Sequence, residues 1–138
     1  FEQALAYSKE ALDIARQVDE NWTIIVCLNS LGEIYTGMEM LPEGKAHLLE
    51  ALKIAIEING LDLVGRVMIN LGRVHQLLGD RERAITLMKA GALHSATEQD
   101  SRDKAQKWLA ELSESLAEGF DDELMNDLIA HPGHGESS

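Results

Sequence analysis

The chain has 138 residues, of which 45% are hydrophobic and only 4% are aromatic, and it carries a formal net charge of −12. Nucleic-acid affinity comes largely from Lys and Arg neutralising phosphates, so this charge argues against nucleic acid and against an anionic membrane surface as partners. The chain has only two prolines, fewer turn residues than a β-sandwich of this length would need. It has no run of about 18 apolar residues, which argues against a transmembrane helix.

Apolar residues recur at helical spacing along most of the chain, and turn residues divide this pattern into segments. Asn59-Gly60 and Gly79-Asp80 favour helix ends, Pro42 suits a first helical turn, and Gly119 is expected to close the sixth helix. In chain order, the long helices are expected over 1–18, 21–38, 42–58, 61–78, 81–98 and 102–118.

The C-terminal part is expected to differ from the rest. Residues 119–130 predict a short acidic helix with an apolar side. The apolar residues of this helix are Leu124, Met125, Leu128 and Ile129. The simpler interpretation is a helix that caps the last hairpin, and the alternative is a helix that docks in a groove of this molecule or of a neighbour. Residues 131–138 are rich in Gly, Ser and His and predict a disordered tail.

The sequence matches itself when it is shifted by 40 residues. Gly32 falls on Gly72, and Ala4 falls on Gly44 and Ala84. Small residues at these positions would let two helices of a hairpin approach closely, which larger side chains would prevent. Three segments with one period predict a repeat architecture.

This pattern resembles the tetratricopeptide repeat family, whose signature is a bulky residue, then Leu-Gly, then Tyr, then Ala, a large apolar residue and Ala. The matching residues of the two full copies are Leu28, Leu31, Gly32, Tyr35, Gly44, Leu48 and Ala51, and then Met68, Leu71, Gly72, His75, Ala84, Met88 and Gly91. The resemblance covers residues 1–118 and implies an all-α fold, a right-handed α-α superhelix of helical hairpins. The period exceeds the family's usual value of about 34 residues, and Ile56 and Ala96 replace the consensus proline. Such long repeats are similar to those of bacterial multidomain signalling proteins and of kinesin-light-chain-like adaptors.

The resemblance also implies a concave face, formed by the first helix of each hairpin, on which ligand contacts flank the buried Leu-Gly. Asn70 is the strongest candidate, because a carboxamide both donates and accepts, with a solvated surface Asn as the alternative. Arg66 and Arg73 either form a small basic strip suited to a carboxylate or are ordinary exposed charges. The last helix would add Lys104 and Lys107. The concave-face candidates are Asn29, Ser30, Glu33 and Thr36 in the first copy, and Arg66, Asn70, Arg73 and Gln76 in the second.

No catalytic or metal site is expected. The histidines stand at spacings that do not suit a metal, and His75, at the consensus Tyr position, is expected to pack in the core. Phosphate loops, nucleophile motifs and paired catalytic carboxylates do not occur at usable spacing, so we expect neither an enzyme nor a cofactor. Cys27 lies in an apolar run and is expected to be buried. Because a single cysteine cannot form a disulfide within the chain, the sequence gives no sign of an oxidising compartment, and we expect the protein in the cytoplasm.

These features predict a protein-interaction module that holds a peptide or partner protein in its concave groove. We expect it to be a piece of a larger bacterial regulatory or signalling protein. The alternative is a scaffold or oligomerisation element without a ligand of its own. Self-association is plausible because Phe1, Leu5 and Leu12 of the first half-repeat lack a partner helix.

Overall fold

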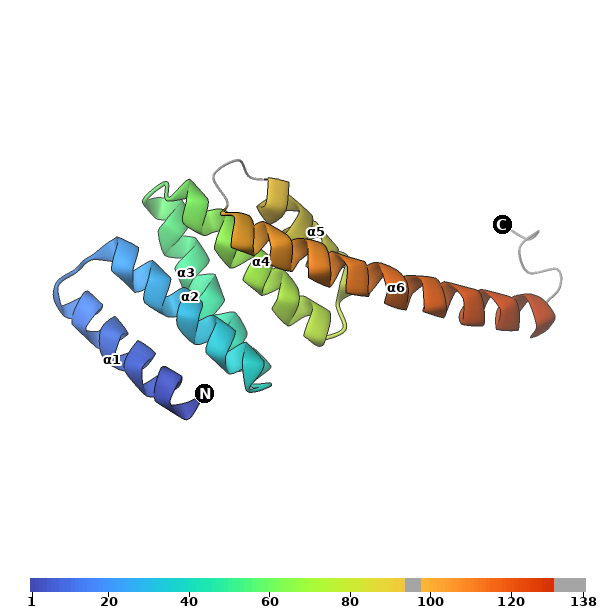
Figure 1. The fold of residues 1–138 in the computed structure, drawn as a ribbon, viewed down its shortest axis with the longest axis horizontal. Helices are drawn as coiled ribbons and strands as arrows, with labels where there is room; N and C mark the ends of the chain where they lie inside the picture. The colour runs from blue at the N-terminus through green and yellow to red at the C-terminus, as the bar shows by residue number, and fades with distance from the viewer. Residues whose placement is uncertain (94–97, 131–138) are drawn as a thin grey trace.

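The chain folds into a stack of helices. The computed structural model describes the backbone of residues 1–93 and 98–130, and the side chains of residues 1–93 and 98–114. Every regular element in these ranges is an α-helix. In chain order the helices are α1 (Glu2–Gln17), α2 (Asn21–Gly37), α3 (Leu41–Glu57), α4 (Leu61–Leu77), α5 (Arg81–Leu93) and α6 (Gln99–Ala130). Helices α2 and α3 form one hairpin and α4 and α5 the next, stacked as expected for an α-α superhelix (Figure 1). The all-α prediction is therefore confirmed.

The turns between the first five helices share one geometry and recur every 20 residues. Each contains one residue in the left-handed region, with φ between 53° and 86°. These residues are Asp19, Glu39, Asn59 and Gly79. In the last of these turns Asp80 also accepts a hydrogen bond from the amide of Arg83 at 3.2 Å, which caps α5 as expected. The repeated turn keeps the hairpins in a constant register.

Close approach within each hairpin depends on glycine. A Cβ at Gly72 would lie 2.6 Å from Cγ of Met88 and 3.1 Å from the carbonyl oxygen of Ala84. A Cβ at Gly32 would likewise overlap the Leu48 side chain. The prediction that small residues at repeated positions let paired helices approach closely is therefore confirmed.

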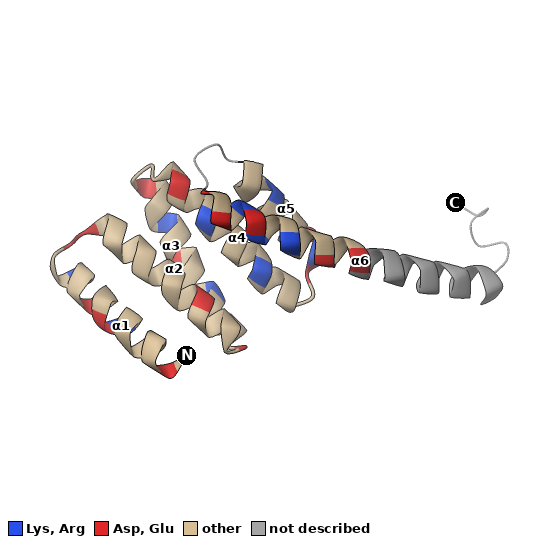
Figure 2. Ribbon diagram, viewed as in Figure 1, with Lys and Arg blue, Asp and Glu red and all other residues tan. Residues whose placement is uncertain are grey.

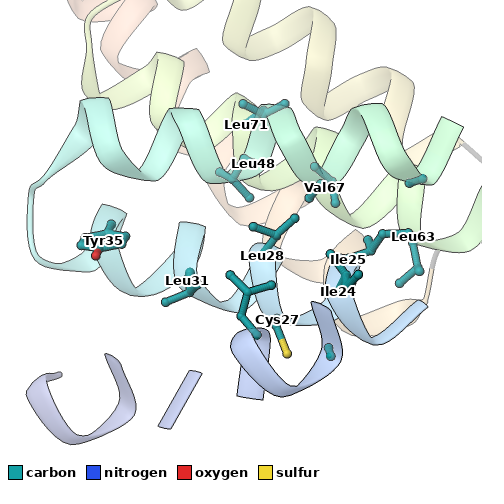
Figure 3. Packing of buried hydrophobic residues seen from close by; sticks show 14 of the residues in the cluster. Ile24, Ile25, Cys27, Leu28, Leu31, Tyr35, Leu48, Leu63, Val67 and Leu71 are labelled. Carbon is teal, nitrogen blue, oxygen red and sulfur yellow. The ribbon is translucent and has the colours of Figure 1, made fainter. Parts of the chain in front are cut away.

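The core is built from aliphatic side chains that the hairpins bury between them. Leu28 of α2, Leu48 of α3 and Val67 of α4 are completely buried and point toward one another (Figure 3). Burial of each such side chain contributes about 1.5–3 kcal/mol, so the stack is stabilised mainly by packing between helices. Cys27 and His75 are also buried, as expected from the sequence.

The C-terminal helices differ from the prediction. Instead of separate helices over 102–118 and 119–130, the structure has the single helix α6, and Gly119 does not end it. Glycine in a helix interior costs only about 1 kcal/mol relative to alanine, which the helix-forming residues on both sides can offset. Because α6 continues without a turn past the other helices, residues 119–130 do not fold back as a separate cap (Figure 1).

Several predictions concern residues that the structure leaves undescribed. The predicted end of the fifth helix at 98 falls beyond Leu93, next to residues 94–97, which lie outside the description. The predicted disordered tail over 131–138 lies outside it as well. The same holds for the side chains of the four apolar residues of the predicted short helix, Leu124, Met125, Leu128 and Ile129.

Candidate binding groove

A groove runs between the first helices of successive repeats. Helix α2 contacts α4, and α4 contacts α6. A cavity of about 540 Å³ lies among these three helices, with one end at the turn between α2 and α3. Its volume is typical of ligand pockets, which measure about 300–1,000 Å³. The cavity therefore lies on the face where the sequence predicts ligand contacts.

A hydrogen-bonded network links the three helices at this groove. Nδ2 of Asn70, on α4, donates to Oδ1 of Asn29 at 2.9 Å and to Oε1 of Glu33 at 3.1 Å, both on α2. Nδ2 of Asn29 donates to the same Glu33 oxygen at 3.3 Å. The other Glu33 oxygen accepts from the ammonium of Lys104, on α6, at 3.4 Å. Glu33 is therefore the centre of a network that ties α2 to α4 and to α6.

The carboxylate of Glu33 fixes the orientation of both asparagines. An ionised carboxylate only accepts hydrogen bonds, so each asparagine must turn its amide nitrogen toward it. Both amide hydrogens of Asn70 are then used, by Asn29 and by Glu33. Its Oδ1 accepts no hydrogen bond from any residue that the structure describes. Asn70 can therefore offer a ligand an acceptor but no free donor, which narrows the two-sided role expected from the sequence.

A second cluster forms the other wall of the groove. The Arg73 guanidinium donates to Oε2 of Glu111 at 3.0 Å and to Oε1 of Gln76 at 2.9 Å. It also lies over the ring of Trp108, with 5.1 Å between Cζ and the ring centroid, a favourable cation–π arrangement. Arg73 is thus held in place from three sides and fastens α4 to α6.

The rest of the lining is partly apolar. Leu77, at the end of α4, is 45% exposed, and Leu41 and Trp108 are half-buried beside the same cavity. Glu39, in the turn after α2, also lines the cavity, and its carboxylate forms no ion pair within the described part of the chain. The groove therefore combines an apolar wall with groups of both charges, and Figure 2 shows the same mixture of signs along the described part of α6.

Most of the candidate residues meet at the groove. Glu33, Thr36, Asn70 and Arg73 line the cavity, as does Lys104 of α6. Asn29 and Gln76 support them through the hydrogen bonds described above. The remaining candidates, Ser30, Arg66 and Lys107, do not line the cavity, and Arg66 instead pairs with Glu98 at 3.5 Å.

Sequence reasoning missed several contributors to the groove, including Leu41 at the start of α3. Trp108 and Glu111 were not identified because α6 departs from the 40-residue register. A shift of 40 residues from Leu71 leads to position 111, but the buried residue is Leu112. Glu39 and Leu77 were not identified because they lie at or just after helix ends, where the family signature has no characteristic residue. The signal that could have found Glu39 is its place in the repeated turn.

The buried side chains of His75 and Cys27 lie outside the groove. Burial lowers the pKa of His75, and the nearby charge of Lys45 lowers it further, against the opposing effect of Asp80. Burial raises the pKa of the Cys27 thiol. Both effects favour the neutral form of a packed side chain, which agrees with structural roles for these residues.

The described residues form neither a metal site nor a membrane span. Within them, no three His, Cys, Asp or Glu side chains are grouped so that they could hold a metal ion. None of the helices is both long and apolar enough to cross a bilayer, as far as the described residues extend.

Residues 23–91 match a family model described as tetratricopeptide repeat. The match covers 69 of the 138 residues, which is half of the chain, and it extends from α2 to α5 across both hairpins. No curated protein matches the chain.

Proposed function

The chain belongs to the tetratricopeptide repeat family, and on this basis we propose that it binds a peptide segment of a partner protein in the groove between α2, α4 and α6. Repeats of this family are in general protein–protein interaction modules. The observation that carries the proposal is the cavity of about 540 Å³, which joins an apolar wall to polar groups on all three helices.

The supporting network makes the groove suitable for binding. Glu33 with Lys104, and Arg73 with Glu111, hold α6 in place across the groove before any ligand arrives. A surface that is already ordered loses less conformational entropy on binding than one that must be assembled. The apolar wall supplies contact area, and the polar groups set the register of the bound segment.

The same network decides which substitutions can test the proposal. Replacing Asn70 or Arg73 would loosen the contacts between helices, so a loss of binding could follow from a loss of structure. Leu77 is the better choice, because it lines the cavity and has no partner in either polar cluster. Leu49 of α3 is a matched control, since it is 47% exposed, compared with 45% for Leu77, and does not line the cavity.

The test is a selection of random displayed peptides against the whole chain, followed by affinity measurements with the L77S and L49S variants. Removing a leucine side chain that a peptide covers costs about 1.5–3 kcal/mol, so L77S should weaken the selected peptides about tenfold or more. L49S should leave their affinity unchanged. The proposal fails if no selected peptide is more sensitive to L77S than to L49S.

A larger context is part of the proposal. We place the module in a cytoplasmic regulatory or signalling protein of bacterial type. The one cysteine of the chain, Cys27, is a buried free thiol, which is compatible with that compartment.

A second candidate function is a scaffold that assembles through α1. The apolar residues expected to lack a partner helix are mostly covered, because Leu12 is buried and Leu5 packs against the core, whereas Phe1 is exposed. A different apolar face is exposed, with Tyr7 and Ile14 on α1 and Val18 just after it at heptad-like spacing. Exposed apolar stripes of this kind mark contact surfaces. Light scattering at increasing concentration would detect assembly, and the I14K variant should abolish it. A wild-type chain that stays monomeric at all concentrations would eliminate this candidate.

A further inference from the structure

The cations of the groove are already paired within the protein. Arg73 lies 3.0 Å from the carboxylate of Glu111, and Lys104 lies 3.4 Å from that of Glu33. A neighbouring carboxylate already offsets each of these positive charges, so an acidic ligand would gain little net attraction from either cation. The groove is therefore poorly suited to acidic ligands, although two cations line it.

Two hydrogen-bond acceptors of the groove have no partner among the described residues. The carboxylate of Glu39 has no ion pair or hydrogen bond among the described residues, and Oδ1 of Asn70 accepts none from them either. The charges that line the cavity balance, with Glu33 and Glu39 against Arg73 and Lys104. Glu111, which pairs with Arg73 beside the cavity, brings the local charge to −1. The net charge of −12 on the whole chain adds a long-range attraction for positive partners.

The apolar wall lies in the same cavity as these acceptors. Leu41 follows Glu39 by two residues, and Leu77 and Trp108 line the cavity from the other helices. Because the Arg73 guanidinium occupies one face of the Trp108 ring, the aliphatic side chains of Leu41 and Leu77 are the main apolar contacts open to a ligand.

We propose that the groove is specific for a basic peptide segment in which a Lys or Arg lies beside a large apolar residue. The cation pairs with Glu39, an N–H of the segment donates to Oδ1 of Asn70, and the apolar side chain packs on Leu41 and Leu77. This inference rests on the proposed function and adds the chemistry of the partner.

Three short peptides test this specificity. They share one sequence with a central leucine and differ only in the two residues beside it, which are lysine, glutamine or glutamate. Their affinities for the whole chain are measured by fluorescence at low and at high salt. The lysine peptide should bind about tenfold more tightly than the glutamate peptide at low salt, and the difference should shrink as salt screens the exposed charges.

The repeated turn supplies a matched pair of variants for the role of Glu39. Glu39 and Asp19 both adopt left-handed backbone, and asparagine adopts it at the equivalent position 59, so E39N and D19N change the same charge in a tolerated geometry. E39N should weaken the lysine peptide about two- to fivefold, as expected for one exposed ion pair, and should not affect the glutamine peptide. D19N should affect neither, because Asp19 does not line the cavity.

The outcomes separate this inference from the proposed function. If the glutamate or glutamine peptide binds as tightly as the lysine peptide, and L77S weakens it, the groove binds peptides but the basic specificity is wrong. If none of the three peptides binds, the basic specificity is also wrong, and the selection with L77S and L49S alone decides the proposed function. An equal effect of E39N and D19N would overturn the role of Glu39.

Discussion

Replacing Gly32 by alanine should destabilise the first hairpin through a clash with Leu48, and this clash can be tested by changing either residue. The new Cβ would lie 2.5 Å from Cδ2 of Leu48 and 3.2 Å from Cδ1, and it would be closer still to Cγ. These three atoms of Leu48 are the heavy atoms nearest to the new Cβ. Leu48 is completely buried, so its side chain cannot move into solvent to make room.

Two opposing effects set the size of the change. Alanine favours a helix interior over glycine by about 1 kcal/mol, whereas an extra methyl group in a packed core costs about 1–3 kcal/mol. Carbon atoms normally approach to about 3.5–4.0 Å, so the required shift is close to 1 Å and the higher part of that range applies. We therefore expect G32A to lower the free energy of unfolding by about 1–2 kcal/mol. Urea denaturation followed by far-ultraviolet circular dichroism measures this quantity.

The sign should reverse when Leu48 is shortened. L48A alone should cost about 2–5 kcal/mol through loss of burial and the cavity that remains. In that background G32A no longer meets Cγ, Cδ1 or Cδ2 of residue 48, gains helix propensity and fills part of the cavity, so it should stabilise the chain by about 1 kcal/mol. Equal destabilisation by G32A in both backgrounds would refute the argument, because the loss would then not arise from the contact between positions 32 and 48.

Three further predictions concern buried polar groups. Because burial lowers the pKa of His75 in the folded state, the unfolded chain takes up a proton first as pH falls, so the free energy of unfolding should decrease as pH drops through the unfolded pKa of about 6.5. H75Y should remove this part of the pH dependence in urea titrations, and an unchanged dependence of the unfolding free energy on pH would contradict the prediction. The buried Cys27 thiol, whose pKa is raised, should react with a thiol reagent much more slowly in the native chain than in urea, and comparable rates would show that it is accessible. N70A should cost about 1–3 kcal/mol, because it leaves Oδ1 of Asn29 without its donor and removes one of the two asparagine donors to Oε1 of Glu33. The N29A/N70A pair should cost less than the sum of the single changes, and strict additivity in the unfolding measurements would argue against the network.

Local chemistry in the sequence was sufficient to predict the repeat. The helix ends at Asn59-Gly60 and Gly79-Asp80 depend on the conformational preferences of the residues themselves. The glycines at positions 32 and 72 showed where helices approach closely, because only a missing side chain permits that distance. The spacing of apolar residues predicted the buried face of each helix, because residues three or four apart lie on the same side of a helix. All of these are properties of residues near one another in the chain.

Only the tertiary structure decided what the groove offers a ligand. Asn70 was a candidate from its place beside Leu71-Gly72, but its hydrogen bonds go to Asn29 and Glu33, about 40 residues away in sequence, and these bonds leave it an acceptor and no donor. The pairing of Arg73 with Glu111 likewise joins separate repeats. Contacts between distant segments depend on how helices pack, so residue type and spacing could mark these positions but could not assign their partners.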